Sequence, residues 1–278
     1  MIKKPDWLRV PYFDDRGSAF VTGLLEELKL HTVCIEANCP NRSECFSNKT
    51  AAFMILGTNC TRNCSFCNVN YGAPQPVDTD EPSRIADAVK RLELQYTVIT
   101  SVTRDDLPDG GAAQFSNVIS AIRNTSPDTV IEVLIPDSIT LKIVTDESPD
   151  VISHNIETVE SLYADIRPDA DYHRSLDIIR SVKKLNPDIH SKSGLMLGLG
   201  ETAEEIVKTF DDLLDAGCEF LTIGQYLSPS KKHYRVREYI EPKIFDEYAV
   251  TARKKGFRHV ASAPFVRSSY HAKNALLE

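Results

Sequence analysis

Six of the seven cysteines lie in two triplets in the first quarter of the chain, and their type and spacing indicate metal chemistry. The triplets are Cys34, Cys39 and Cys45 (C-x4-C-x5-C), followed by Cys60, Cys64 and Cys67 (C-x3-C-x2-C). Thiolates are soft ligands that suit zinc and iron–sulfur clusters. A structural zinc takes four protein ligands and a cubane cluster usually takes four cysteines, so each triplet is one ligand short. The alternatives are a cluster with one iron open to another ligand, or a structural zinc completed from elsewhere in the chain.

The bulk properties favour metal ligands over disulfides. The net charge is -8, so no overall basic field predicts a nucleic-acid partner. No apolar stretch approaches the roughly 20 residues that span a bilayer, and the amino terminus lacks the apolar run of a secretory signal. We therefore expect a cytoplasmic protein without a membrane partner, and a monomer by default. A reducing cytosol keeps clustered cysteines as thiols.

The elements that must position the triplets follow a β/α rhythm. Six apolar runs rich in β-branched residues alternate with helical patterns after residue 50, as parallel strands do. The runs cover residues 52–57, 96–101, 130–135, 151–156, 193–198 and 220–224. Six units are too few for a closed eight-stranded barrel. The pattern predicts an α/β fold, an open partial (β/α)6 TIM-like barrel, with its site at the carboxyl ends of the strands.

The helical signals are local. Pro82 opens a helix whose apolar face holds Ile85 and Val89. Thr202-Ala-Glu-Glu205 is a capping box that opens another helix, and Gly217 is a natural stop for it.

One structural unit in three parts is the simplest organisation. Residues 1–50 form an N-terminal extension that carries the first triplet, residues 51–240 the barrel, and residues 241–278 a C-terminal extension. Helical spacing predicts a helix before Cys34. Residues 34–50 contain several turn-forming residues, and we expect an irregular metal-binding loop there rather than helix or strand; the turn formers are Asn38, Pro40, Asn41, Ser43 and Asn48.

The second triplet resembles the signature of the radical S-adenosylmethionine (SAM) superfamily. It directly follows the first predicted strand, and the aromatic Phe66 precedes its third cysteine. The resemblance implies that the second triplet holds a [4Fe-4S] cluster whose open iron binds S-adenosyl-L-methionine. The protein would position the cofactor and exclude water, while the cofactor carries the radical chemistry.

Further motifs resemble the lipoyl synthase family over nearly the whole chain. These are the first triplet, Asn59–Cys67, Val98–Leu107, Asp109–Gly111, His154–Thr158, Lys192–Glu201, Gly224–Leu227 and Pro264–His271. The resemblance implies that the first triplet holds an auxiliary [4Fe-4S] cluster closed by a serine of Arg267-Ser-Ser-Tyr270. Family alignment favours Ser269, and spacing alone leaves Ser268 open. A serine oxygen is a poor match for an iron–sulfur cluster, so it should bind iron weakly. A weak ligand can leave when the auxiliary cluster has to open.

The same resemblance implies the reaction and its participants. Two sulfur atoms from the auxiliary cluster would be inserted at C6 and C8 of a protein-bound N6-octanoyl-lysine, with two S-adenosyl-L-methionine molecules per product. The partners would be an octanoylated lipoyl carrier domain, from a 2-oxoacid dehydrogenase E2 subunit or the glycine cleavage H protein, and a low-potential electron donor. A biotin synthase-like sulfur-insertion enzyme is one alternative, and a zinc-stabilised module without catalysis is another.

Polar and glycine residues near the predicted strand ends are candidate cofactor contacts. In the superfamily the loop equivalent to Asp109, Gly110 and Gly111 meets the methionine moiety, although such a motif alone is often a plain turn. Glu132 interrupts an apolar run that we expect to be buried. A buried carboxylate needs a partner, and the ribose hydroxyls would supply one; the alternative is that Glu132 faces outward. Asn155 and Glu157 follow the fourth run, where polar groups suit cofactor contact.

Two candidates come later in the chain. Lys192 begins the fifth strand region, and a lysine so near a buried run indicates a carboxylate partner, such as that of the methionine moiety. Gly198 lies in a Gly-Leu-Gly sequence that resembles the superfamily's adenine motif, although this pattern alone is weak. A basic run after the sixth strand is either a solvated loop or a docking surface for an acidic carrier domain; it comprises Lys231, Lys232, His233, Arg235 and Arg237.

Overall fold

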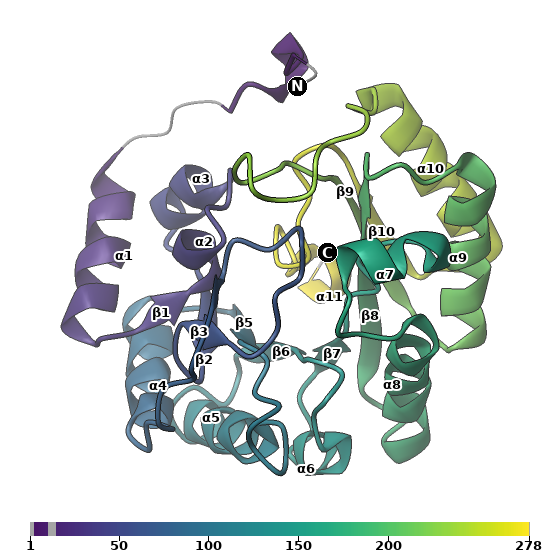
Figure 1. The fold of residues 1–278 in the computed structure, drawn as a ribbon. Coiled ribbons are helices and arrows are strands. Elements are labelled where there is room, and N and C mark those ends of the chain that lie inside the picture. The colour runs from purple at the N-terminus through teal and green to yellow at the C-terminus, as the bar shows by residue number, and fades with distance from the viewer. Residues whose placement is uncertain (1–2, 11–14, 278) are drawn as a thin grey trace. The chain divides into compact units, whose positions relative to one another are not determined.

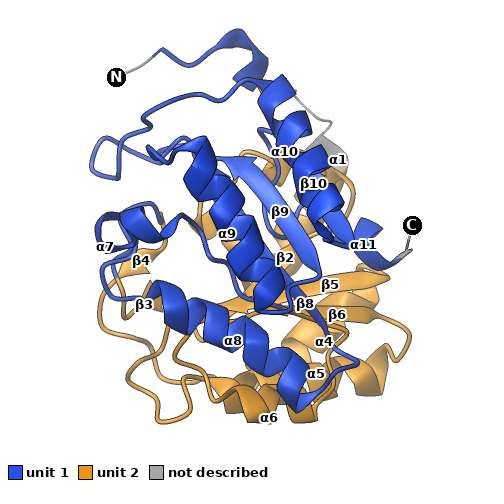
Figure 2. Cartoon of the chain, turned by 90° about the vertical axis from the view of Figure 1, so that its right-hand side faces the viewer, with its two compact units in different colours: residues 1–9, 63–67, 153–278 blue, residues 10–62, 68–152 orange. Residues whose placement is uncertain are grey.

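The computed structural model describes residues 3–10 and 15–277, which form the elements labelled in Figure 1. They divide into two compact units, coloured in Figure 2. Unit 1 comprises residues 1–9, 63–67 and 153–278, and unit 2 comprises residues 10–62 and 68–152.

Unit 2 is built on β-strands whose inner members are parallel. In spatial order its strands are β1 (His31–Thr32), β2 (Ala52–Ile55), β5 (Tyr96–Ser101) and β6 (Val130–Leu134). β1 is antiparallel to β2, whereas β2 pairs with β5 and β5 with β6 in parallel register. A separate parallel pair is formed by β3 (Asn59–Cys60) and β4 (Asn70–Tyr71). The chain passes from unit 2 to unit 1 within β7 (Val151–Ser153).

The helices of unit 2 follow from its apolar patterns and its stop signals. They are α1 (Asp15–Glu27), α2 (Val33–Glu36), α3 (Arg42–Ser47), α4 (Glu81–Arg91), α5 (Ala112–Thr125) and α6 (Leu141–Asp146). Pro82 occupies the first turn of α4, where a missing N–H costs no helical hydrogen bond. Ile85 and Val89 are buried on one face of α4. This arrangement confirms the helix that the sequence predicted there.

Unit 1 has three parallel strands, β8 (His190–Leu197), β9 (Phe220–Gln225) and β10 (His259–Ser262), in that order. Figure 2 shows α8, α9 and α10 beside these strands. The helical elements of unit 1 are η1 (Asp6–Leu8), η2 (Glu160–Leu162), α7 (Tyr163–Ile166), α8 (Tyr172–Leu185), α9 (Ala203–Asp215), α10 (Pro242–Lys255) and α11 (Asn274–Leu277). Leu195, Ile223, Phe210 and Phe245 join one buried cluster, so strands and helices share a core.

Most local predictions are confirmed. All six apolar runs contain strands, and both halves of the capping box at Thr202 and Glu205 are present at the start of α9. Gly217 follows the helix with a left-handed φ of 82°. The sequence did not predict the short strands β1, β3, β4 and β10.

The expectation of an irregular loop over residues 34–50 is wrong. Cys34 lies inside α2 and Cys45 inside α3, although both helices are short. Thr32 explains the first of them, because its side chain caps α2 by accepting a hydrogen bond from the backbone N–H of Ile35. The three-part division at residues 50 and 240 stays a prediction, and the two units cut across it. Within the described residues, no helix has the length and apolar character needed to cross a membrane.

Candidate functional site

The second triplet begins at the end of β3. Cys60 is the last residue of this strand, and its backbone carbonyl accepts a hydrogen bond from the N–H of Gly72 at 3.2 Å. Its sulfur accepts two backbone N–H groups, from Arg62 at 3.4 Å and from Thr103 at 3.3 Å. Such contacts offset part of the negative charge of a thiolate. Cys60 is thus held by backbone donors on the residues that follow β3 and β5.

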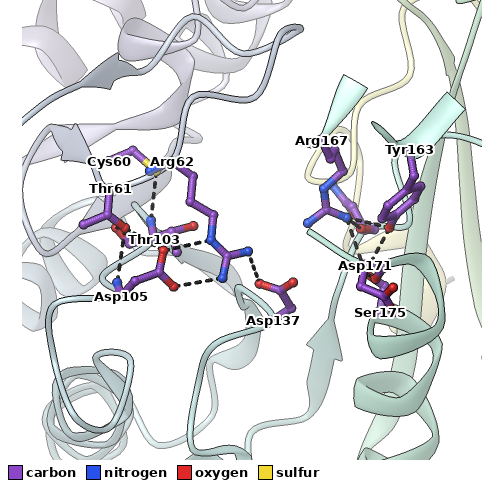
Figure 3. Close-up of polar contacts among 11 residues, drawn as sticks. Cys60, Thr61, Arg62, Thr103, Asp105, Asp137, Tyr163, Arg167, Asp171 and Ser175 are labelled. Carbon is purple, nitrogen blue, oxygen red and sulfur yellow. Dashed lines mark hydrogen bonds and ion pairs between the residues drawn. The ribbon is translucent and has the colours of Figure 1, made fainter. Parts of the chain in front are cut away.

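Arg62, between the first two cysteines of this triplet, anchors its part of the loop (Figure 3). Its guanidinium donates two hydrogen bonds of 2.8 Å to the carboxylate of Asp105, and it also donates to Asp137. The side chains of Arg62 and Asp137 are 9% and 1% exposed, so this ion pair is buried. Thr61 adds hydrogen bonds to Asp105 and to the backbone of Thr103. We call Arg62, Asp105 and Asp137 the Arg62 clamp.

Within the Arg62 clamp, the electrostatics favour the charged forms of Arg62 and Asp105. Burial disfavours the guanidinium charge, but the hydrogen bonds and charges of Asp105 and Asp137 outweigh this effect and raise the pKa of Arg62. In turn, the hydrogen bonds from Arg62 lower the pKa of Asp105. One oxygen of Asp137, Oδ2, is buried without a hydrogen-bond partner among the described residues. The sequence interpretation missed this clamp, and its only local signal was an arginine placed between two candidate metal ligands.

Residues 63–67, which belong to unit 1, hold the other two cysteines of this triplet. The backbone N–H of Cys67 donates to the carbonyl of Cys64 at 3.1 Å, which forms a turn. The backbone N–H of Ser65 donates to the carbonyl of Ile166 at 3.0 Å, and the hydroxyl of Ser65 donates to the carbonyl of Asp165 at 2.7 Å. Phe66 packs on a small buried cluster with Tyr226. Local turns and apolar packing therefore hold Cys64 and Cys67.

The cysteines of the first triplet lie within electrostatic range of one another in unit 2. The N–H of Cys39 donates to the carbonyl of Cys34 at 3.1 Å. Burial, with a smaller contribution from the charge of Cys39, raises the pKa of the Cys34 thiol to about 11. Burial and the charges of Cys34 and Cys39 raise the pKa of Cys45 to about 12. Bound iron would favour the thiolate form, so this donor set fits an iron–sulfur cluster.

None of the seven cysteines forms a disulfide. Among the residues that the structure describes, no group of three or more His, Cys, Asp or Glu side chains has the geometry of a metal site. The assignment of both triplets as cluster ligands therefore stays a prediction from their spacing and donor chemistry.

The segment that contains Ser268 and Ser269 lies at the carboxyl end of β9 in unit 1. The N–H of Gln225 donates to the carbonyl of Pro264 at 3.2 Å. A Cβ atom on Gly224 would lie 2.1 Å from the carbonyl oxygen of Val266, so only glycine allows this approach. Ser268 and Ser269 are both partly buried. The role of Ser269 as the fourth ligand stays a prediction, because it lies in unit 1 and the first triplet in unit 2.

Asp109, Gly110 and Gly111 all make close contacts with other parts of the protein. The carboxylate of Asp109 accepts hydrogen bonds from the N–H groups of Gly111 at 2.9 Å and Ala113 at 2.8 Å, which places it at the start of α5. A Cβ atom on Gly110 would lie 2.4 Å from the carbonyl oxygen of Ser138. On Gly111 it would lie 2.3 Å from Leu56 Cδ1. Close packing of protein explains both glycines, and contact with a cofactor stays a prediction.

Glu132 is fully buried in β6, so the alternative that it faces outward is wrong. The hydroxyl of Tyr96 donates to Glu132 Oε2 at 2.6 Å. This bond supplies a partner that a buried carboxylate needs. A contact between Glu132 and ribose stays a prediction.

Asn155 and Glu157 fit the predicted cofactor contact best, on the evidence of one buried atom. The side-chain oxygen of Asn155 is buried and has no hydrogen-bond partner among the described residues, whereas its amide nitrogen donates to Glu157 at 3.0 Å. Glu157 lies in unit 1, within electrostatic range of Arg267. Burial raises its pKa, and the charges of Arg167 and Arg267 oppose this shift. A hydroxyl or amine donor on a cofactor would satisfy the buried oxygen of Asn155.

Arg167 holds the backbone of Asn155, and Figure 3 shows it beside Tyr163 and Ser175. Its guanidinium donates to the backbone carbonyl of Asn155 at 3.1 Å and to the hydroxyl of Tyr163 at 2.8 Å. The hydroxyl of Tyr163 donates in turn to Ser175 at 2.9 Å. The network fixes the backbone at the position where Asn155 turns away from β7.

Lys192 and Gly198 lie on β8 or directly after it. Lys192 is 3% exposed, and its positive charge acts on the nearby thiol of Cys218. Gly198 has a φ of 95°, and a Cβ atom there would lie 2.3 Å from both the side chain of Gln225 and the carbonyl oxygen of Glu238. The role of both residues in cofactor binding stays a prediction.

The backbone donors of the Gly-Leu-Gly sequence are already used. The carboxylate of Glu201 accepts hydrogen bonds from the N–H groups of Gly198, Leu199 and Gly200 at 2.6, 2.9 and 2.9 Å. Burial raises the pKa of Glu201, and these three donors oppose the shift. Recognition of an adenine by this sequence would have to use other groups than these N–H donors.

Solved structures show which fold the chain shares. It matches the FeFe-hydrogenase maturase HydG from Carboxydothermus hydrogenoformans with a TM-score of 0.61 and 12% identity, over 95% of this chain and 68% of that one. It matches methylornithine synthase (PylB) with a TM-score of 0.56 and 15% identity, over 91% of this chain and 87% of that one. These similarities and the mostly parallel sheet confirm the predicted α/β fold of the partial-barrel class.

The sequence comparisons identify the family. A family model described as Radical SAM superfamily matches residues 54–213. The lipoyl synthase of Caldicellulosiruptor saccharolyticus is 56% identical over 276 residues, which cover 98% of this chain and 96% of that protein. The lipoyl synthase of Alkaliphilus metalliredigens is 52% identical over 278 residues, covering 99% and 96%. The chain is therefore an enzyme of the radical SAM superfamily and belongs to the lipoyl synthase family.

Proposed function

We propose that this enzyme inserts two sulfur atoms at C6 and C8 of an octanoyl chain that is amide-linked to a lysine of a lipoyl carrier domain. The observation that carries the proposal is the pair of cysteine triplets in one chain of this family. In unit 2, burial raises the pKa of Cys34 and of Cys45, and the charges of other cysteines of the first triplet add to both shifts, which supports their placement near one another. The family membership supports the substrate class, because relatives at 52–56% identity are named lipoyl synthase.

The residues of the chain have distinct tasks in this proposal. When bound, the cluster on Cys60, Cys64 and Cys67 would supply the electron that cleaves S-adenosyl-L-methionine, and the auxiliary cluster would supply sulfur. Asn155 would accept a hydrogen bond from the cofactor through its unpartnered oxygen. An oxygen ligand from Ser269 would bind iron weakly and could therefore leave when sulfur is transferred.

The proposal also names what the enzyme needs from outside. Each product requires two S-adenosyl-L-methionine molecules and a low-potential electron donor. The carrier would be the lipoyl domain of a 2-oxoacid dehydrogenase E2 subunit or the glycine cleavage H protein. We place the reaction in the cytoplasm, with a monomeric enzyme and without a nucleic-acid or membrane partner.

Anaerobic turnover tests the proposal directly. The reconstituted enzyme is incubated with an octanoyl-lysyl peptide, S-adenosyl-L-methionine and a reductant. The mass of the peptide is then measured by mass spectrometry. We expect two added sulfur atoms together with 5′-deoxyadenosine. Formation of 5′-deoxyadenosine without sulfur insertion would refute the product but not the radical chemistry. Colourless protein with stoichiometric zinc would instead support the non-catalytic alternative.

Matched variants separate the two triplets. Replacing Cys34, Cys39 and Cys45 with alanine should abolish sulfur insertion while cleavage of S-adenosyl-L-methionine continues, because the second triplet is intact. Ser269→Ala should impair sulfur insertion, and Ser268→Ala is its matched control one residue away. Equal effects of the two serine changes on sulfur insertion would refute the assignment to Ser269.

A further inference from the structure

Figure 1 shows β9 and α10, which a loop of unit 1 joins. By its sequence this loop carries a group of cations. Lys231, Lys232, Arg235 and Arg237 are all exposed. None of these four forms an ion pair with a carboxylate in the part of the chain that the structure describes. Among the described residues some exposed cations have such a partner, as Lys142 has in Asp146, and others such as Lys90 and Lys184 have none, but here four cations without one lie within seven residues. We call residues 231–237 the cationic loop.

The cationic loop is built onto the segment that holds Cys64 and Cys67. The backbone N–H of Tyr234 donates to the carbonyl of Ser65 at 2.8 Å. The Nε2 atom of His233 lies 3.0 Å from the carbonyl oxygen of Cys67, while its Nδ1 atom lies 2.8 Å from the hydroxyl of Ser230. With the hydroxyl as donor to Nδ1, the proton of this imidazole is on Nε2 and is donated to Cys67.

Further bonds fix the rest of this loop. The hydroxyl of Tyr226 donates to the carbonyl of Tyr234 at 2.7 Å, and the N–H of Arg237 donates to the carbonyl of Gly198 at 2.8 Å. The guanidinium of Arg237 lies 5.4 Å from the centre of the Tyr234 ring. The loop therefore presents its charges from an ordered backbone, which lowers the entropy lost when a partner binds.

The charge of the whole chain limits the partners that this loop suits. A protein of net charge -8 gives an acidic partner no overall attraction, so such a partner would need a local cationic patch. The cationic loop combines that patch with direct contact to the cluster-binding segment. We propose that it docks the acidic surface of the carrier domain, so that the acylated lysine enters next to the residues that hold Cys64 and Cys67. This inference rests on the proposed function and names the docking surface of its substrate.

The test compares two triple charge reversals in the full-length holoenzyme. The test variant is Lys231→Glu, Lys232→Glu and Arg235→Glu. The control variant is Lys184→Glu, Lys243→Glu and Lys254→Glu, which makes the same change of charge on exposed helix positions of unit 1. His233 and Tyr234 stay unchanged, because they contact the cluster-binding segment.

The probes are an octanoylated lipoyl carrier domain and a short, uncharged octanoyl-lysyl peptide. At low ionic strength we expect the test variant to raise the KM for the carrier about tenfold or more, and to weaken carrier binding in calorimetry by a similar factor. Added salt should reduce this difference from the wild type. Turnover of the peptide should stay as in the wild type, and the control variant should bind the carrier like the wild type.

Two results would overturn the docking surface. One is carrier binding by the test variant that is as tight as in the wild type. The other is an equal loss of activity on carrier and peptide, which would indicate damage to the cluster-binding segment. If the wild type adds no sulfur to the peptide, the proposed function fails instead, whereas carrier binding still reports on the loop.

Discussion

Removal of the guanidinium of Arg62 should destabilise unit 2 by several kcal/mol. Arg62→Gln leaves the carboxylate of Asp137 buried, at 1% side-chain exposure, without its cation. Loss of one partner of a buried ion pair costs about 3–5 kcal/mol. Asp105 adds little to this cost, about 0–1 kcal/mol, because its side chain is 39% exposed and water can solvate it. We therefore expect a loss of about 3–5 kcal/mol.

Urea denaturation of the cluster-free protein measures this loss. The double variant Arg62→Gln, Asp137→Asn should recover much of it, because the buried charge is then gone. Arg180→Gln is the matched control, since Arg180 pairs with Asp177 on the surface, and it should cost at most about 0.5 kcal/mol. A loss below about 1 kcal/mol for Arg62→Gln, or a double variant as unstable as the single one, would refute the reasoning.

Three further changes test other parts of the structure. Asp105→Asn should be less stable than the wild type above about pH 4, and the two proteins should become equally stable at lower pH. The reason is that the pKa of the Asp105 carboxyl is lowered in the folded protein, so its contribution to stability is lost as pH falls. A stability difference in urea titrations that does not depend on pH would contradict this. Gly110→Ala should lower the free energy of unfolding by at least about 1 kcal/mol, since φ is 64° and the new Cβ would meet a backbone carbonyl. Gly23→Ala has open space around the new Cβ and should stabilise α1 by about 0.5–1 kcal/mol. Thermal melting of the two variants compares these effects. Thr202→Ala should cost about 1 kcal/mol by removing the cap of α9, and Thr140→Ala, whose side chain makes no cap bond, should cost less in the same assay.

The strands were predictable because their signal is local. The run at residues 96–101 is apolar and β-branched, and it forms β5 with the same bounds. Short elements lack such a signal: β10 has four residues, and only its register beside β9 defines it. The helix that holds Cys34 was missed because its apolar pattern is only one turn long. Secondary structure of this length depends on neighbours that the sequence does not identify.

The site was predictable only in part, for a related reason. The spacing of the cysteines identified the candidate ligands and the family, since both are properties of the sequence order. The bonds of Arg62 to Asp105 and Asp137 span 43 and 75 residues, and no periodicity encodes them. The glycines at 110 and 198 were predicted as ligand contacts. The structure shows protein backbone close to both of them, and contact with a ligand stays a prediction. A glycine in the sequence indicates that another group approaches the backbone closely, and only the fold identifies that group as protein or ligand.

The bond between Cys67 and His233 has a consequence for the order of events during synthesis of the protein. The two residues are 166 positions apart, and Tyr234 holds Ser65 across a similar separation. The cysteines are translated early, but the groups that hold residues 65–67 appear only after most of the chain has left the ribosome. Contacts of such long separation are slow to form, because a long loop of chain must close first. We therefore expect the segment around Cys64 and Cys67 to reach its final form after synthesis, so that iron is loaded onto a finished chain rather than a growing one.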